Sequence, residues 1–296
     1  MQFKRIYEEL FMASDISQRI KNSYHTFSKG QKKIANAIMN EYDKAAYMTA
    51  ARLGHYVGVS ESTVVRFAGT LGFDGYMEFQ RAVQELVRTR LTPNQRIEIT
   101  KQRIGRGEVL ENVMESDIGK IRYTLDTLDR STFFKSVDAI LEARTVYIIG
   151  ARSAVVLAQM LDYNLSMIFD NVKFVHATSS AEIFEQMFSI GENDVLIAFS
   201  FPRYSTKIVG AVKYARSRGA TVIGFTDSEI SPVAEHSDFL LTAQSDMASF
   251  MDSLVAPVSI INAIIVEITR RREKEITARF DALEAIWDEY GVYTKR

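Results

Sequence analysis

Five short apolar runs in the second half of the chain restrict its fold more than any other feature. They are TVYIIG (145–150), VKFV (172–175), DVLIAFS (194–200), ATVIGFT (220–226) and SDFLLT (237–242), and helical segments separate the early ones. Continuous apolar strands that alternate with helices are typical of a parallel sheet that is covered on both faces. The pattern therefore predicts an α/β fold, with a doubly wound domain built on a five-stranded parallel sheet.

The first third of the chain has the periodicity of helices instead. Apolar residues recur at Ile34, Ala35, Ile38 and Met39 after a capping Ser28. Residues 88–107 are rich in Arg, Thr and Gln, contain a proline and lack an apolar stripe. We therefore predict a helical domain over residues 1–87, a linker over 88–107, and the α/β domain with C-terminal helices over 108–296.

Charge is divided unevenly between these parts, although the whole chain carries a net charge of only −1. There are 17 basic and 10 acidic residues up to Arg106, against 19 basic and 27 acidic residues after it. A basic segment beside an acidic one is a weak indication that the N-terminal part contacts nucleic acid.

The composition and the longest apolar segments indicate the cellular compartment of the chain. It has no cysteine, which excludes disulfides and thiolate metal sites and fits the cytoplasm. Its first residues, MQFKRIYEELF, resemble an amphipathic helix more than a signal peptide. The longest uncharged stretch, 253–266, is 14 residues long and too short to span a membrane. The run 254–268 is apolar nearly all round, which predicts burial in the core or in a subunit interface.

A helix-turn-helix pattern occupies residues 49–76. Helices are expected at 49–57, from Glu61 to about Leu71, and at 73–86. Either Ala51 or Ala50 would be the small residue where two helices cross, and Gly58 would take the turn conformation. Val64 and Phe67 would point inward.

That pattern predicts which side chains would contact DNA. Short hydroxyl side chains in the first turn of a recognition helix reach base edges, and an arginine one turn later can bond guanine or phosphate. Lysines at the start of the preceding helix suit backbone phosphates. An ordinary three-helix bundle with solvated charges is the alternative on spacing alone. The predicted DNA-binding residues are Lys29, Lys32, Lys33, Ser60, Ser62, Thr63 and Arg66.

Polar residues follow the first and third strands of the predicted sheet. Gly150 and Ser153 come after the first strand, and Ser200, Ser205 and Thr206 come after the third. Hydroxyls and helix N-termini that converge at the carboxyl ends of strands favour an anion, so these turns predict a phosphate site. Taken singly, each serine is equally consistent with a simple helix cap.

A third loop, after the second strand, adds His176, Ser179 and Glu182 as candidate contacts to sugar hydroxyls. His176 is equally consistent with a solvated strand end. The four histidines have no metal-binding spacing, so no metal site is expected. Glu182, Glu229 and His236 are possible bases by residue type, but none lies in a recognisable catalytic motif. No catalytic residue is therefore predicted.

The helical segment resembles the RpiR family of bacterial transcription regulators, whose pattern reads "A..lgVS.sTVvRF...LGf.Gy.ef". An S-x-x-Q-x-x-I-A-x-x-I segment before it matches at Ser28, Gln31, Ile34, Ala35 and Ile38, and the resemblance covers about residues 24–86. It implies a homodimer or tetramer that binds near-palindromic, double-stranded operator DNA. The other matching residues are Ala51, Val57, Gly58, Val59, Ser60, Thr63, Val64, Arg66, Phe67, Leu71, Gly72, Phe73, Gly75, Tyr76 and Phe79.

The strand-end turns resemble the SIS (sugar isomerase) domain that this family carries after its helix-turn-helix. The family's first loop reads G-x-G-x-S. Gly150 matches its start, Arg152 replaces its second glycine, and Ser153 comes one position before its serine, where Ala154 stands instead.

The family's second loop reads S-x-S-G-x-T, and the corresponding loop of this chain departs from that pattern in a similar way. Ser200 matches its start and Ser205 takes the place of the threonine, whereas Pro202 and Arg203 replace the middle Ser-Gly. The proline removes one phosphate donor, and a charge-assisted bond from either arginine would compensate for it.

The resemblance implies a regulator, expected to be a repressor, whose SIS domain senses a phosphorylated sugar or amino sugar without a cofactor. The arginine substitutions leave another acidic metabolite open as the effector. Two other functions stay open on the sequence: a sugar-phosphate isomerase with an accessory helical domain, and a sugar-binding module whose helical domain meets protein.

Overall fold

The computed structural model describes residues 16–90, 92–103, 109–246 and 249–293. The chain divides into two compact units, residues 1–99 and 100–296. The division falls inside the segment predicted as a linker, which contains a helix, α8 (Pro93–Arg103). The amphipathic helix predicted for the first residues lies outside the described residues.

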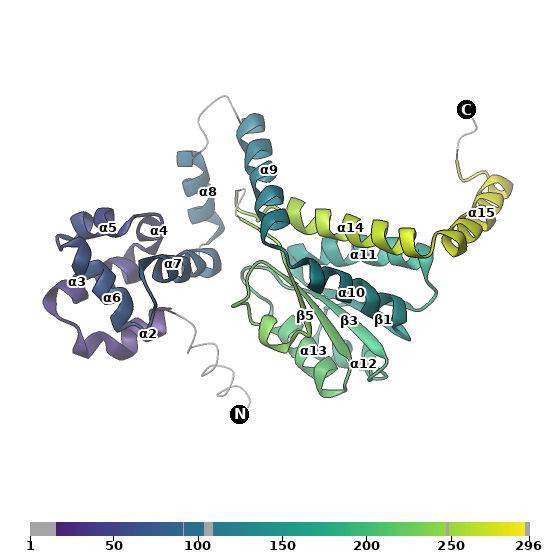
Figure 1. Cartoon of the computed structure of the whole chain (residues 1–296), viewed down its shortest axis with the longest axis horizontal. Coiled ribbons are helices and arrows are strands. Elements are labelled where there is room, and N and C mark those ends of the chain that lie inside the picture. Colours follow the sequence, from purple (N-terminus) through teal and green to yellow (C-terminus); the bar gives the residue numbers. More distant parts are fainter. Residues whose placement is uncertain (1–15, 91, 104–108, 247–248, 294–296) are drawn as a thin grey trace. The chain divides into compact units, whose positions relative to one another are not determined.

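The described residues of the first unit form helices and no strands (Figure 1), and aromatic side chains fill its core. Phe67 is fully buried, with ring centroids 5.1 Å from Phe27 and 5.7 Å from Phe79. Ser28 caps the third helix reciprocally with Gln31, as expected. The helices are α2 (Ile16–Ser23), η1 (Tyr24–Thr26), α3 (Lys29–Asn40), α4 (Tyr42–Ala45), α5 (Ala50–Val57), α6 (Glu61–Thr70) and α7 (Tyr76–Arg90).

The sequence pattern missed two features of this unit. It did not predict α4, a single turn that is too short to show a period. The family resemblance also began only at about residue 24, yet Ile16 and Ile20 of α2 are buried in the core. The last helix starts at Tyr76 rather than Phe73, because Gly72 takes a φ of 83° and ends the preceding helical segment.

The second unit is a doubly wound α/β domain. Its five strands form one parallel sheet in the order β2-β1-β3-β4-β5. The strands are β1 (Thr145–Gly150), β2 (Val172–Val175), β3 (Asp194–Phe199), β4 (Thr221–Thr226) and β5 (Phe239–Thr242). The five predicted runs are thus confirmed, with ends that differ by two residues at most.

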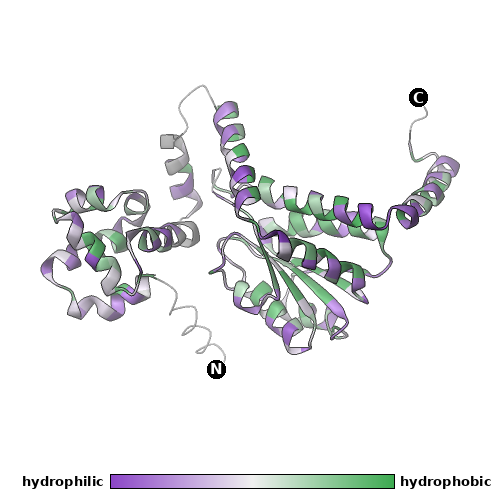
Figure 2. Ribbon diagram, in the orientation of Figure 1, coloured by the Kyte–Doolittle hydropathy of each residue, from purple (hydrophilic) through white to green (hydrophobic). Residues whose placement is uncertain are grey.

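Helices cover both faces of this sheet (Figure 1). The helices are η2 (Arg152–Ala154), η3 (Ala234–His236), α9 (Val109–Thr127), α10 (Arg130–Glu142), α11 (Val155–Ile168), α12 (Ser180–Gln186), α13 (Thr206–Ser217), α14 (Val255–Arg271) and α15 (Glu273–Tyr290). Helices α10, α11 and α14 lie on one face, and α12 and α13 lie on the other. Burial on both faces explains why the strands are uniformly apolar (Figure 2).

The apolar run at 254–268 lies mainly in α14 and belongs to the hydrophobic core. Ala256, Ile260, Ile261, Ile264 and Ile268 are buried against the sheet's main cluster. The core alternative is therefore confirmed for this run. Among the described residues, no helix combines the length and apolar character that crossing a membrane requires.

The strand order places a topological switch point between β1 and β3. From β1 the chain winds outward to β2, and from β3 it winds the other way through β4 to β5. Gly150 and Phe199, the last residues of β1 and β3, are register partners. In open α/β sheets a crevice forms outside the carboxyl ends of the strands at this point. The loops that start at Gly150 and Ser200 therefore flank the place where a ligand is expected.

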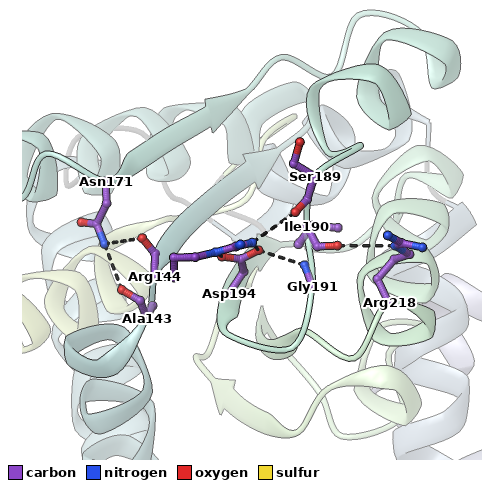
Figure 3. A network of polar contacts seen from close by, with 8 residues as sticks. All are labelled: Ala143, Arg144, Asn171, Ser189, Ile190, Gly191, Asp194 and Arg218. Atoms are coloured by element: carbon purple, nitrogen blue, oxygen red, sulfur yellow. Dashed lines mark hydrogen bonds and ion pairs between the residues drawn. The ribbon is translucent and has the colours of Figure 1, made fainter.

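A polar network closes the opposite edge of the sheet, at the amino ends of the strands (Figure 3). Arg144 donates to both carboxylate oxygens of Asp194, at 2.9 and 2.6 Å, and to the carbonyl of Ser189. Burial opposes ionisation of Asp194, but the hydrogen bonds from Arg144 and from the Gly191 N–H outweigh it, so its pKa is lowered. Asn171 donates to two carbonyls of the turn before β1.

We predict that Asp194→Asn destabilises the protein at pH 7 by about 1–3 kcal/mol, because it breaks a buried charge-assisted pair. A carboxyl with a lowered folded pKa stabilises the protein fully above its unfolded pKa, which is about 3.9. That contribution is lost as the pH falls through the folded pKa. The difference between wild type and variant should therefore be constant near neutrality and shrink below about pH 4.

Urea unfolding followed by circular dichroism at pH 7 and pH 3 measures that difference. Asp170→Asn is the matched control, because Asp170 pairs with Arg279 on the surface and its side chain is 87% exposed. The control should change stability little. Equal effects of the two substitutions at pH 7 would contradict the prediction.

Candidate functional site

The turn between α5 and α6 has the geometry of a helix-turn-helix. Gly58 ends α5 in the left-handed region at a φ of 70°, a conformation that favours glycine. The Val59 N–H donates to the Gly54 carbonyl at 2.8 Å, which closes the turn. Ser60 then caps α6 and accepts from the Thr63 N–H at 3.3 Å.

Gly54 of α5 lies close to the backbone of the turn and of the start of α6. A Cβ at that position would lie 2.9 Å from the Val59 carbonyl oxygen and 3.3 Å from the Glu61 nitrogen. The sequence pattern had pointed to Ala51 or Ala50; Ala50 is buried, but Ala51 is exposed. The second glycine of the motif, four residues before Gly58, was the missed signal.

Helix α6 presents the predicted face to solvent. Val64 and Phe67 are fully buried, as expected, whereas Ser62 and Arg66 are exposed and Thr63 is half-buried. A recognition helix needs its first turns accessible over its N-terminal end, because those side chains contact base edges. The orientation of α6 therefore agrees with the predicted role.

The hydroxyls at the start of α6 bond to each other. Ser60 Oγ lies 2.9 Å from Ser62 Oγ and 2.8 Å from Thr63 Oγ1. Ser60 thus acts as a cap and also orders its two neighbours. Contact with a base edge would exchange these weak mutual bonds for bonds to the DNA.

The start of α3, which carries the predicted lysines, lies against this turn. A Cβ at Gly30 would lie 3.4 Å from Val59 Cγ1 and 3.5 Å from Thr63 Cγ2. Lys33 Nζ is 3.7 Å from a Cβ built at Gly58. Lys29, the first residue of α3, is exposed, and Lys32 is half-buried with its ammonium 5.5 Å from the Tyr24 ring centroid. Of the three predicted lysines, Lys33 therefore lies beside the α5–α6 turn, whereas Lys32 lies against Tyr24.

We predict that Gly54→Ala lowers the stability of the helical unit by about 1–3 kcal/mol, because the added methyl meets backbone that cannot move aside. The matched control is Gly69→Ala in α6, where an added Cβ meets nothing within 4 Å among the described residues. Gly69→Ala should raise the stability of the helical unit by about 0.5–1 kcal/mol, because alanine favours the helix more than glycine does. Thermal unfolding of both variants measures the contrast, and destabilisation by Gly69→Ala would contradict it.

In the second unit, the two loops at the switch point share an unusual backbone conformation. Arg152 has a φ of 56° and Arg203 a φ of 64°, the only positive values among the described non-glycine residues. These are the two positions where the sequence has arginine in place of the glycine of the SIS pattern. A side chain in this region costs about 1–2 kcal/mol. The loop geometry is therefore retained although the glycines are not.

Close packing requires glycine at Gly150, the last residue of β1. A Cβ there would lie 2.6 Å from the Ala154 carbonyl oxygen and 3.0 Å from the Ala158 side chain. This close approach lets the chain turn from β1 directly into η2 and α11. Ser153 lies exposed in η2, before the first turn of α11.

The loop after β3 carries a buried hydroxyl. Ser200 is 2% exposed, and its Oγ makes no hydrogen bond to any residue that the structure describes. Ser205 is the N-cap residue of α13 but forms no capping bond through its side chain, and Thr206 is exposed. Buried polar groups are normally paired, so an unpaired hydroxyl at this edge marks a position that a ligand could satisfy.

The loop after β2 contains the third group of predicted residues. The His176 ring is exposed and packs edge-on against Phe174, 4.9 Å between centroids. Ser179 caps α12 by accepting from the Glu182 N–H, and Thr178 hydrogen-bonds the Glu182 carboxylate.

A lysine that the sequence pattern missed connects two of these loops. Lys207 Nζ, on the first turn of α13, donates to the Thr178 carbonyl at 2.5 Å and to the Ala177 carbonyl at 3.4 Å. It therefore links the loops after β2 and β3. The only available signal was its place beside the Ser205-Thr206 helix start.

Two further buried serines follow β4 and β5. Within the described part of the chain, the hydroxyls of Ser231 and Ser245 have no hydrogen-bond partner. Tyr204 donates to Asp227 at 2.9 Å, which joins the loops after β3 and β4. No sequence motif marks these positions, because a serine after a strand is common in any loop.

The residues that could act as bases are not brought together. Glu182 follows β2 and Glu229 follows β4, and both are exposed, whereas His236 lies in η3 just before the amino end of β5. Burial, with Lys213 nearby, lowers the pKa of His236. Among the described residues, no group of three His, Cys, Asp or Glu side chains has the geometry of a metal site.

A cavity of about 380 Å³ lies at the opposite edge of the sheet from the loops described above. Asp138, Glu142, Asn193, Asp194 and Thr221 contribute to its lining, with none of the predicted effector residues. It is therefore separate from the candidate site at the carboxyl edge.

Each of the two parts of the chain matches a known protein family. Residues 14–89 match the helix-turn-helix domain of the rpiR family, and residues 139–267 match the SIS domain. The first match contains the α5–α6 turn, and the second contains the whole parallel sheet. These matches define a DNA-binding transcriptional regulator with a C-terminal SIS domain. The chain belongs to the RpiR family.

Individual relatives agree with this assignment. An HTH-type transcriptional regulator from Haemophilus influenzae is 25% identical over 240 residues, covering 77% of this chain and 80% of the relative. The sugar isomerase domain of an RpiR transcription factor from Sphaerobacter thermophilus has a TM-score of 0.58 at 23% identity, covering 60% of this chain and 99% of that one. The NanR protein from Vibrio vulnificus, complexed with ManNAc-6P, has a TM-score of 0.59 at 18% identity, covering 94% and 99%.

Proposed function

We propose that two copies of this regulator bind a near-palindromic operator through α6 and repress transcription in the cytoplasm, and that a phosphorylated sugar or amino sugar controls this binding. The observation that carries the DNA part is the exposed face of α6, on which Ser62 and Arg66 are accessible, with Lys33 beside the turn before it and Lys29 exposed at the start of α3. Basic side chains hold phosphates, and the first turns of the helix contact base edges.

We predict that Arg66→Ala weakens binding to the operator more than binding to unrelated DNA. Loss of a bidentate contact to a base costs about 1–3 kcal/mol of discrimination. Fluorescence anisotropy with a duplex from the DNA upstream of the gene, and with a scrambled duplex, measures both affinities. Binding should also weaken steeply with salt, because several phosphates are contacted.

Arg81→Ala is the control for this measurement, since Arg81 is exposed on α7, outside the two helices of the motif. It should leave the ratio of specific to non-specific affinity unchanged. Equal changes in that ratio for Arg66→Ala and Arg81→Ala would refute the proposed role of α6. Binding without salt dependence would favour a helical domain that meets protein.

The proposed effector site consists of the loops at the β1/β3 switch point. The unpaired hydroxyl of Ser200, the N-terminus of α13 and the two arginines in left-handed conformations support an anion there. Ser153, Ser205 and Thr206 border the same edge. His176, Ser179 and Glu182, on the loop after β2, are proposed to contact the sugar. The complex of the NanR protein with ManNAc-6P makes phosphorylated amino sugars the first class to test.

We predict that Ser200→Ala lowers effector affinity without lowering the stability of the free protein. The Oγ forms no protein hydrogen bond within the described residues, so its removal breaks none, whereas a lost bond to a phosphate costs about 1.5–3 kcal/mol. Arg203→Gly should behave similarly, because glycine adopts the same backbone without strain and only the guanidinium is lost.

Thermal shift over a panel of hexose phosphates, amino-sugar phosphates and other acidic metabolites tests both variants, because a ligand of the folded state raises the melting temperature. Each compound is paired with its unphosphorylated form. An unchanged shift in Ser200→Ala and Arg203→Gly would contradict the proposed site.

We also propose that the SIS domain binds its ligand without converting it. A regulator needs only a coupling free energy of about 1–3 kcal/mol between effector and DNA. Glu182 and His236, which could move a proton, lie at opposite edges of the sheet. Incubation of the protein with the same phosphorylated sugars tests this proposal. Formation of an isomerised product would overturn binding without conversion and favour a sugar-phosphate isomerase.

A further inference from the structure

Helix α9 is amphipathic in the reverse sense. All of its apolar side chains except Val113 face solvent, and they are 39–67% exposed. On a different face of the helix, Lys120 and Thr124 are 5% and 4% exposed. An apolar stripe of this length on a surface helix indicates an interaction site. The exposed stripe consists of Leu110, Met114, Ile118, Ile121 and Leu125.

The buried polar face of α9 is fixed by hydrogen bonds to its own domain. Lys120 Nζ donates to Ser116 Oγ at 2.7 Å and to Asp117 Oδ1 at 3.0 Å. Asp117 also accepts from Ser253 Oγ, and Thr124 Oγ1 accepts from the Gln244 N–H at 2.9 Å. Rotation of the helix to bury its apolar stripe would break the bonds from Ser253 and Gln244, which lie outside α9.

The stripe is nearly symmetric about its own centre. Its members are spaced by four, four, three and four residues, the spacing of a helix-pairing seam. When a second copy of α9 lies antiparallel, Leu110 is level with Leu125 of the other copy and Met114 is level with Ile121. The two copies of Ile118 are then offset by only about 1.5 Å along the helix axis, so they meet beside the two-fold axis. Such self-complementarity is what a two-fold interface requires.

Charges beside the stripe select the antiparallel arrangement. Glu111, Glu115 and Arg122 lie on one flank and are exposed. In an antiparallel pair, Arg122 of one copy falls level with the point midway between Glu111 and Glu115 of the other, about 3 Å along the axis from each. In a parallel pair this flank would face the opposite flank of the other copy, so Arg122 would meet neither glutamate.

We propose that α9 is a homodimer interface, which packs antiparallel against α9 of a second copy of this chain with Ile118 beside the two-fold axis. This surface rests on the proposed homodimer and specifies where its two copies meet.

The absence of cysteine from the chain permits a clean cross-linking test on the full-length protein. A disulfide needs Cα atoms about 4.4–6.8 Å apart, which the antiparallel pair provides at position 118. Leu110 lies about 22 Å from its own copy, because fifteen residues separate it from Leu125 along the helix. Ile118→Cys should therefore form a covalent dimer on oxidation, Leu110→Cys should not, and the double variant Leu110→Cys/Leu125→Cys should.

Failure of Ile118→Cys to cross-link, or equal cross-linking by Leu110→Cys, would overturn the proposal. Sedimentation of the wild type distinguishes failure of the α9 interface from failure of the proposed homodimer. A dimer mass without the cross-link overturns only the α9 surface, whereas a monomer mass overturns the proposed homodimer as well. Neither result affects the DNA and effector tests.

Charge reversal gives a second, independent readout. Arg122→Glu should raise the dimer dissociation constant about tenfold at low salt, since it places like charges opposite each other. The triple variant Glu111→Arg/Glu115→Arg/Arg122→Glu should restore dimerisation. Val266→Glu, on an exposed apolar position of α14, is the control and should leave the constant unchanged. No rescue by the triple variant would overturn the antiparallel arrangement.

Discussion

Burial of both faces of the parallel sheet is the constraint on which the rest of the second unit depends. Apolar strands covered by α10, α11 and α14 on one side and by α12 and α13 on the other leave only the two edges open to polar groups. At the amino edge, the ion pair of Arg144 with Asp194 is satisfied within the protein (Figure 3). At the carboxyl edge, Ser200 keeps a buried hydroxyl that no described residue satisfies. The two edges thus differ in that the polar groups at the amino edge are paired within the protein, whereas Ser200 at the carboxyl edge is not.

The sequence alone was sufficient for features that depend on local pattern. The five apolar runs, the Ser28 and Ser60 caps and the Gly58 turn are short-range signals, and the structure has each of them. The two domain types followed from the change in period along the chain. These features are predictable because the residues that determine them lie within a few positions of each other.

Features that depend on packing between distant segments could not be predicted in this way. Gly54 is required because the Val59 carbonyl comes within 2.9 Å of its missing Cβ, and Lys207 matters because its ammonium reaches the loop after β2. The exposed stripe of α9 is a further case. Its spacing predicts a buried helix face, and only the three-dimensional fold shows that Lys120 and Thr124 occupy the buried side instead.

The uneven charge determines how the two proposed ligands can be attracted. The basic segment up to Arg106 favours DNA over a distance, and this attraction is lost with salt. The segment after it is acidic, so its overall field does not favour an anionic effector. Such an effector has to gain its binding energy at short range, within the screening length of about 8 Å. Helix N-termini, the Ser200 hydroxyl, Arg152 and Arg203 are groups of this kind. The arginines tolerate a strained backbone at the two positions where a local positive charge would compensate for an acidic domain.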